Sequence, residues 1–184
     1  MVKMKLEDAK SEWGDRLHIA SLAALAKSDT IFRILHDGTH GVKVNPKTKV
    51  RDQVRMPSVS EQKKILAIVS ETHAPRFALK ADVSKAHRRV RVQRRDWGAQ
   101  ACRLDREDEV WLNTVGTFGL ASAGYYWGRL VAALGRLIFY CSPAWNFWQL
   151  VFADDFSWTA QGEGFELQLL FTLYLYVVLG VPFT

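Results

Sequence analysis

Three aspartates have the residue type and surroundings of a metal-binding group. Asp154 and Asp155 are adjacent within the apolar stretch LVFADDFSW at residues 150–158, and Asp82 ends the strand-like stretch RFALKAD. Adjacent carboxylates repel each other, and charges in apolar surroundings are costly unless they are paired. A bound divalent cation offsets this repulsion, whereas a solvated acidic turn is the alternative explanation for the pair alone.

If the strands that carry these acids are neighbours in a sheet, the three carboxylates meet at one edge. Magnesium prefers carboxylate oxygen and keeps several water ligands beside substrate phosphates. Two such ions about 4 Å apart can activate an attacking oxygen and stabilise a leaving one during phosphoryl transfer. We therefore expect two Mg²⁺ ions as the cofactor, bound by Asp82, Asp154 and Asp155.

The positive charge of the chain is concentrated in its first half. The 184 residues carry a formal net charge of +6, and the sequence pI is about 9.4. The run KAHRRVRVQRR at residues 85–95 is basic, whereas no Lys or Arg follows Arg136. This pattern favours a nucleic-acid partner, although a solvated helix face is the alternative for the basic run. The candidate phosphate contacts are Arg88, Arg89, Arg94 and Arg95.

Composition and motifs exclude several classes of protein. A hydrophobic content of 48% excludes a disordered chain, and the absence of a GxxxxGK loop excludes a P-loop NTPase. With two cysteines and no apolar core in MVKMKLEDAKSEW, we expect an intracellular protein of the nucleus or cytoplasm, not a secreted one. The apolar residues 167–183 are interrupted by Gly180 and Pro182, so we expect a buried helix and no membrane partner.

The hydrophobic patterns predict a mixture of strands and helices. Ser58 and Glu61 form a capping box before an apolar run, which predicts the start of a helix. The expected strands are residues 31–35, 42–44, 76–83, 99–104, 110–115, 148–153 and 156–160. The other expected helices are residues 18–27, 84–90, 121–141 and the last apolar run. This order predicts an α+β fold in which helices pack on one face of an antiparallel sheet.

Four stretches resemble motifs of reverse transcriptases, in the order that this family has them. FADD resembles the two-aspartate hairpin, and LKADVSKAHRRV resembles the first palm motif, a strand that ends in an aspartate. TFGLASAGYYWGRL resembles the turn and helix between them, and FRILHDGTHGVKVN is similar to the fingers strand with its arginine. The resemblance covers roughly residues 30 to 184 and implies a polymerase palm with partial fingers.

The resemblance assigns roles around the metal ions. It implies that Asp82 and Asp154 bind the two catalytic Mg²⁺ ions, that Asp155 assists, and that the backbone carbonyl of Val83 completes one ion's ligands. The partners would be an RNA or DNA template-primer and deoxynucleoside triphosphates.

The resemblance also assigns five nucleotide-binding residues, one of which is Val83, already named as a metal ligand. Arg33 would contact the triphosphate, with a solvated strand charge as the alternative. Gly119 would let the backbone lie close to template or nucleotide, with a plain turn glycine as the alternative. Phe118 stands where many relatives have glutamine. His87 stands where the family usually has the Phe or Tyr that excludes a ribose 2′-hydroxyl, so sugar selection is altered or His87 is shielded and behaves normally.

The sequence predicts three parts: an N-terminal helical segment at residues 1–29, partial fingers at 30–75 and the palm at 76–184. The sequence ends at Thr184, before the lysine-bearing strand and the thumb of relatives, so we expect a thumbless chain with poor grip on a duplex. Three functions remain open: a reverse transcriptase of retroelement type, a non-catalytic nucleic-acid-binding remnant, and an RNA-templated RNA polymerase. The oligomeric state is left open.

Overall fold

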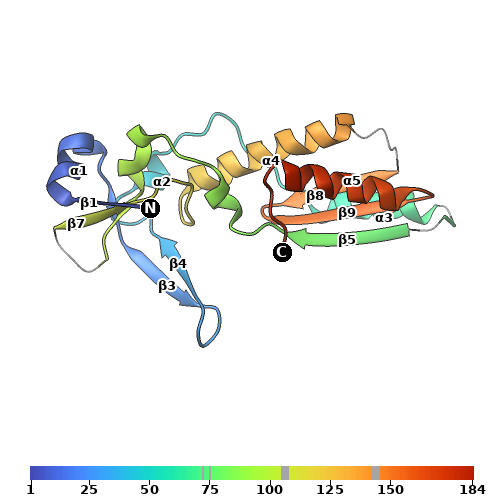
Figure 1. The fold of residues 1–184 in the computed structure, drawn as a ribbon, viewed down its shortest axis with the longest axis horizontal. Helices are drawn as coiled ribbons and strands as arrows, with labels where there is room; N and C mark the ends of the chain where they lie inside the picture. Colours follow the sequence, from blue (N-terminus) through green and yellow to red (C-terminus); the bar gives the residue numbers. More distant parts are fainter. Residues whose placement is uncertain (72, 75, 105–107, 142–145) are drawn as a thin grey trace. The chain divides into compact units, whose positions relative to one another are not determined.

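The computed structural model describes residues 1–71, 73–74, 76–104, 108–141 and 146–184 (Figure 1). The chain forms two compact units. Unit 1 consists of Met1–Gln53 and His87–Trp127, and unit 2 of Val54–Ala86 and Gly128–Thr184. Helix α4, Ala121–Cys141, begins in unit 1 and ends in unit 2. The expected division into an N-terminal segment, partial fingers and palm, with boundaries after residues 29 and 75, stays a prediction.

Unit 1 is built around a sheet with the strand order β1-β7-β6-β2. Trp13 and Ala9 of helix α1 pack against Ala101, Val110 and Leu112 of this sheet, and this cluster is the core of unit 1. The elements of the unit are β1 (Val2–Lys5), α1 (Leu6–Trp13), β2 (Ile19–Ala20), β3 (Leu22–Ala26), β4 (Phe32–His36), α2 (Val44–Lys47), β6 (Ala101–Cys102) and β7 (Glu109–Leu112). Short 3₁₀ helices occupy Gly14–Arg16 and Arg94–Gln100, and a third, Ala86–Arg89, crosses the boundary with unit 2.

Several sequence predictions for unit 1 are confirmed. The strand at residues 31–35 is β4, and the expected hairpin of residues 99–104 and 110–115 is the antiparallel β6–β7 pair. Its connection includes residues 105–107, which lie outside the described residues.

Two predictions for unit 1 are wrong. Residues 18–27 are not a helix, because Leu22–Ala26 pairs with Phe32–His36 as the antiparallel β3–β4 hairpin. The ladder hydrogen bonds outweigh the helical preference of Ala and Leu. Residues 42–44 are not a return strand, because β4 already has β3 as its partner and Val44 begins α2. Pro46 fits the first turn of that helix, where its missing N–H has no intrahelical acceptor.

Unit 2 is built around a three-stranded antiparallel sheet with the order β5-β9-β8 (Figure 1). Its elements are α3 (Val59–Ser70), β5 (Arg76–Asp82), β8 (Phe147–Phe152), β9 (Asp155–Gln161) and α5 (Phe165–Val178). The Ser58–Glu61 capping box starts α3 as predicted. The expected strands at 76–83, 148–153 and 156–160 are β5, β8 and β9, and the expected helix at 121–141 is α4.

The core of unit 2 is an aromatic cluster on one face of its sheet. Phe156 and Trp158 of β9 contact Tyr176 of α5, with ring centres 5.2 and 6.4 Å away. Gln149 of β8 accepts a hydrogen bond from the Trp158 indole at 2.7 Å and donates one to the Tyr176 hydroxyl at 2.8 Å. Phe183 closes the cluster at 5.5 Å from Trp158. These contacts fix β8, β9 and α5 against one another.

Helix α5 is only half buried. Leu169, Thr172 and Tyr176 are buried, whereas its other apolar side chains include the exposed Leu167, Leu170, Tyr174, Val177 and Val178. The prediction of a buried helix is therefore wrong for one side of α5. No helix within the described ranges is long and apolar enough to cross a membrane.

Candidate active site

The two adjacent aspartates lie where β8 turns into β9. Ala153 and Asp154 form a two-residue turn between Phe152 and Asp155, so Asp154 is in the turn and Asp155 is the first residue of β9. Ala153 has φ of 56°, a left-handed conformation that costs a residue with a Cβ roughly 1 kcal/mol. The tight turn places Asp154 half-buried and Asp155 exposed at the end of the sheet.

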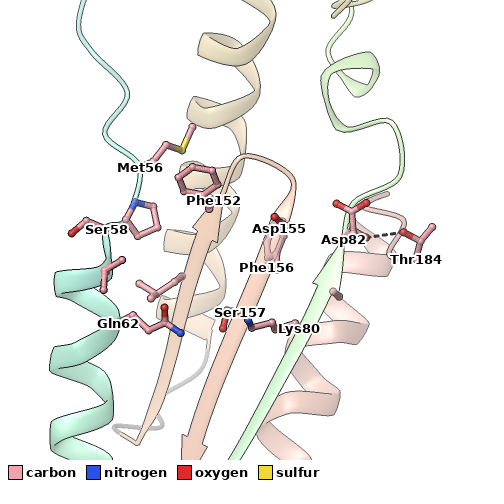
Figure 2. Close-up of a pocket in the computed structure, with 14 residues that line it drawn as sticks. Met56, Ser58, Gln62, Lys80, Asp82, Phe152, Asp155, Phe156, Ser157 and Thr184 are labelled. Atoms are coloured by element: carbon pink, nitrogen blue, oxygen red, sulfur yellow. Dashed lines mark hydrogen bonds between the residues drawn. The ribbon is translucent and has the colours of Figure 1, made fainter. Parts of the chain in front are cut away.

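Asp82 reaches the same end of the sheet from β5. It is the last residue of β5 and pairs directly with Asp155 in the antiparallel register. Directly paired residues project on the same face of a sheet, with Cβ atoms about 5 Å apart. The next residue, Val83, donates its N–H to the Asp154 carbonyl at 3.0 Å. The backbone therefore brings all three predicted acids to one end of the sheet, and Figure 2 shows Asp82 and Asp155 there.

The residues at Pro182–Thr184 pair with the outer edge of β5 at this end. Asp82 and Thr184 exchange backbone hydrogen bonds of 3.4 and 2.9 Å, and Ser84 donates to the Pro182 carbonyl at 3.0 Å. The Thr184 hydroxyl also donates to the Asp82 carbonyl at 3.3 Å, as Figure 2 shows. Val83 is buried with 1% exposure beneath this pairing. The position of Asp82 is thus fixed by backbone contacts on both sides of its strand.

The donor set at this end of the sheet fits a hard divalent cation in its chemistry. Its side chains are carboxylates only, and within the described part of the chain no Lys, Arg or His forms an ion pair with Asp82, Asp154 or Asp155. The described residues therefore leave these three carboxylates without an ion-pair partner. In their present orientation the side chains do not form a complete metal-coordination site. The described residues contain no group of three or more His, Cys, Asp or Glu close enough to hold a metal ion.

A groove of about 900 Å³ opens beside the carboxylates. Its floor is the sheet face opposite the aromatic core, where Lys80 pairs with Ser157 one row below Asp82 and Asp155 (Figure 2). The start of α3 forms one wall, with Met56 and Gln62. The groove combines apolar surface, hydroxyl and amide groups, the Lys80 ammonium and the carboxylates of Asp82 and Asp155.

Four of the five predicted nucleotide-binding residues, Arg33, His87, Phe118 and Gly119, lie in unit 1, whereas Val83 lies in unit 2. The Arg33 guanidinium carbon lies 5.1 Å from the centre of the Phe118 ring, and the His87 ring lies 4.8 Å from that centre. Gly119 has φ of 96°, and a Cβ there would lie 1.8 Å from the His36 carbonyl oxygen. A side chain at residue 119 would therefore clash with the backbone of β4, so the fold itself requires glycine here, with or without a bound nucleotide.

Sequence reasoning missed Asn45, which holds the turn that carries Phe118 and Gly119. Its Nδ2 donates to the Gly119 carbonyl at 2.7 Å and to the Thr39 hydroxyl at 2.9 Å. Its Oδ1 accepts from the N–H of Ala121, the first residue of α4, at 2.9 Å. An Asn-Pro dipeptide indicates only a turn or the end of a strand, and no sequence signal connects residue 45 with residues 119 and 121.

The basic run is only partly available for phosphate. Arg94 makes two hydrogen bonds to the Glu12 carboxylate, at 2.8 and 3.0 Å, and lies over Trp97. The Arg94 hydrogen bond lowers the pKa of Glu12 and raises the pKa of Arg94. Arg94 therefore joins α1 to the 3₁₀ helix Arg94–Gln100. Arg95 lies 3.6 Å from Asp96, and Arg88 and Arg89 are exposed in the 3₁₀ helix Ala86–Arg89.

Comparison with known proteins identifies a similar fold. The structure of a foamy viral protease–reverse transcriptase in complex with double-stranded DNA matches 90% of this chain with a TM-score of 0.61 and 14% sequence identity. This chain spans 25% of the length of that protein. No family model matches the sequence, and no curated protein matches it. At this identity the similarity concerns the fold: the chain has an α+β, reverse-transcriptase-like fold.

Proposed function

We propose that this chain is a reverse-transcriptase-like nucleotidyltransferase of retroelement type. It would add deoxynucleotides to a primer 3′-hydroxyl on an RNA template. The observation that supports this most is the pairing of Asp82 with Asp155 at the sheet end where the turn places Asp154. Three carboxylates that have no ion-pair partner among the described residues, on a reverse-transcriptase-like fold, are a reason to expect a cation at this place.

In this proposal, one group of residues would bind the metal ions and another would position the substrate. Asp82 and Asp154 would hold two Mg²⁺ ions, with help from Asp155 and the Val83 carbonyl. When bound, the ions would neutralise charge on the triphosphate and on the attacking and leaving oxygens. Arg33 would bind the triphosphate and His87 would contact the sugar. The chain's own contribution is therefore orientation and charge placement rather than covalent chemistry.

Primer extension tests the proposal. Purified wild type, Asp154→Asn and the matched control Glu163→Gln are compared on an RNA template with a DNA primer, deoxynucleotides and Mg²⁺. Glu163 is exposed in the loop between β9 and α5, so its change alters the same net charge without touching the site. We expect Asp154→Asn to lose at least about a hundredfold in rate and Glu163→Gln to keep wild-type rate. Equal activity of wild type and Asp154→Asn would remove the acids from the mechanism.

A second candidate is a module that binds nucleic acid without catalysis. The observation in its favour is that the three acids, as oriented among the described residues, do not form a three-carboxylate metal group. The similar foamy viral protein is in complex with double-stranded DNA. Exposed Arg88 and Arg89 would supply phosphate contacts.

Binding in EDTA separates the two candidates. If RNA or DNA binding persists in EDTA while no extension occurs with Mg²⁺, the binding module is favoured. Arg88→Ala with Arg89→Ala should then weaken binding and flatten its dependence on salt concentration. Unchanged affinity in that double variant would reject Arg88 and Arg89 as phosphate contacts. An RNA-templated RNA polymerase, the third alternative, would incorporate ribonucleotides in preference to deoxynucleotides.

A further inference from the structure

A second cavity of unit 2 opens between α4, α5 and β8. Its volume is about 310 Å³, and all residues that line it belong to unit 2. Phe147 and Gln149 of β8 border it, and Gln149 takes part in the aromatic core through Trp158 and Tyr176. The cavity therefore lies on the face of the sheet opposite the groove beside the acids, and the two share no residue.

Gly135 of α4 leaves space at the polar end of this cavity. A Cβ at this position would lie 3.2 Å from Gln149 Nε2 and 3.9 Å from the Tyr176 hydroxyl oxygen. Glycine in the interior of a helix is unfavourable relative to alanine. What it provides here is room beside the Gln149 amide, which a side chain on α4 would otherwise occupy.

The sides of the cavity are apolar and mostly aromatic. Ile138 and Phe139 come from α4, and Phe147 comes from β8. Ile138 is buried with 3% exposure, whereas Phe139 is 68% exposed. The cavity is thus closed at Ile138 and open to solvent at Phe139. An apolar hollow of this size with a few polar groups is typical of a small-molecule site.

The amide groups at the cavity have N–H donors to spare. Gln168 of α5 lines the cavity, and its buried Nε2 has no hydrogen-bond partner among the described residues. A buried donor without an acceptor is costly, so a missing partner is the simplest explanation for it. Gln149 gives one N–H to the Tyr176 hydroxyl and accepts the Trp158 indole N–H, so its second N–H remains for a ligand.

Arg136 adds a positive charge to the same cavity. It follows Gly135 on α4, is exposed, and forms no ion pair among the described residues. Within the described part of the chain, no Asp or Glu lines the cavity. The cavity therefore carries one cation and several amide donors, and these residues provide no carboxylate to balance them.

This donor set and lining define the chemistry of a ligand. An ionised carboxylate has two oxygens with about four acceptor sites and no donor, and it pairs with a guanidinium through two parallel hydrogen bonds. A phosphate dianion would bring more charge than a single arginine balances, into a hollow with mostly apolar sides. The rings of Phe139 and Phe147 favour a flat apolar part, because aromatic rings pack well in offset or edge-to-face contacts.

We propose that this cavity binds a small aromatic carboxylate. Arg136, Gln149 and Gln168 receive the carboxylate, and Phe139 and Phe147 contact the ring. The ligand supplies the acceptor that the Gln168 amide lacks and fills the space that Gly135 leaves. The inference does not rest on the proposed polymerase function, because the site contains neither the acids nor any residue of the groove beside them.

Nuclear magnetic resonance of the full ¹⁵N-labelled chain tests the site with phenylacetate as the probe. The titration is done in EDTA without nucleic acid, and the side-chain amide signals of Gln168 are identified by their loss in Gln168→Leu. We expect these signals to move downfield in wild type as the carboxylate accepts their hydrogen bonds. Phenylacetamide has the same shape without the charge and should bind at least about tenfold more weakly.

Four variants separate the cavity from general charge effects. Arg136→Gln should weaken phenylacetate binding at least about tenfold, and Gln168→Leu should weaken it roughly three- to tenfold. Ala132→Phe, at an exposed position that lines the cavity, keeps every donor but obstructs the space and should abolish binding. Arg76→Gln removes an exposed arginine of β5 outside the cavity and should bind as wild type does. Circular dichroism checks that each variant is folded.

Three results would overturn the inference. Unmoved Gln168 signals at about 10 mM phenylacetate would show that the cavity holds water only. Equal affinity for phenylacetamide, or wild-type affinity in Arg136→Gln, would reject the carboxylate. Wild-type affinity in Ala132→Phe would place the binding outside the cavity. Primer extension by the same wild-type sample without phenylacetate reports separately on the proposed function.

Discussion

Asp82 and Asp155 face each other as a direct cross-strand pair, the last residue of β5 opposite the first residue of β9. Like charges in this relationship are destabilising, and among the described residues no cation forms an ion pair with either of them. A fold that keeps such a pair loses stability in the absence of a ligand. This relationship underlies the proposal that the sheet end binds metal ions.

The first prediction concerns stability without metal. Asp82→Asn should raise the free energy of unfolding in EDTA by up to about 1 kcal/mol, because it removes the repulsion with Asp155. Added Mg²⁺ should stabilise wild type more than Asp82→Asn, since only wild type has the full set of carboxylates. Thermal denaturation in EDTA and in Mg²⁺ measures both effects. A wild type that is indifferent to Mg²⁺ would speak against a cation at this position.

The local elements were predictable from sequence for a physical reason. The Ser58–Glu61 capping box, the apolar stretches of β8 and β9 and the turn at the acids are signals within a few residues, and all three are found. The pairing of β5 with β9 was only a condition of the metal-site hypothesis, because local pattern does not tell which strands become neighbours, and the structure has this pairing.

Features that depend on distant partners were not predictable. Residues 22–26 read as a helix by composition, but hairpin pairing with β4 makes them a strand. The contacts of Phe118 with Arg33 and His87 join three places far apart in the sequence, and nothing in the sequence indicates them. The ion pair between Arg94 and Glu12 was not predictable either. Arg94, a residue of the basic run, therefore joins two elements of unit 1, which the composition does not indicate.

The second prediction concerns the hydrogen-bonded chain in the core of unit 2. Burial raises the pKa of the Tyr176 hydroxyl to about 12, so the group is neutral and must be satisfied by Gln149. Gln149→Leu should destabilise the protein by about 2 kcal/mol or more, because it leaves the Trp158 indole N–H and the Tyr176 hydroxyl without this partner. Urea denaturation measures the loss. Gln62→Leu, at an exposed position on α3, is the control and should change stability little.

The third prediction concerns pH. His36 is buried with 3% exposure, and neither ring nitrogen has a hydrogen-bond partner among the described residues. Desolvation lowers its pKa below the ordinary value of 6.5. The folded state therefore holds His36 neutral, so its stability is full above pH 6.5 and is lost as the pH falls from there toward the lower pKa of the folded state.

Denaturation of wild type and His36→Gln at pH values from about 5 to 7.5 tests this dependence. The wild type should lose stability with a slope of at most about 1.4 kcal/mol per pH unit, and His36→Gln should show a flatter profile. His73→Gln changes an exposed histidine and should keep the wild-type slope. Identical profiles for wild type and His36→Gln would show that His36 does not cause the dependence.

The fourth prediction concerns Asn45. Asn45→Ala removes three hydrogen bonds, to Thr39, Gly119 and Ala121, and should destabilise the protein by about 1–3 kcal/mol. Asn45→Asp keeps the acceptor for the Ala121 N–H at the start of α4 but loses both donated bonds, so its loss should be smaller. Thermal denaturation ranks the three proteins. Equal stability of wild type and Asn45→Ala would show that the turn at Phe118 and Gly119 is held by other contacts.

The most direct measurement of the central claim is Mn²⁺ binding followed by electron paramagnetic resonance, with Mn²⁺ in place of Mg²⁺. The full wild-type chain is titrated beside Asp82→Asn, Asp154→Asn and the control Glu163→Gln. We predict that wild type and Glu163→Gln bind Mn²⁺ with the same affinity and that each of the other two variants loses at least about tenfold. Equal Mn²⁺ affinity in all four proteins would contradict a metal site formed by Asp82, Asp154 and Asp155.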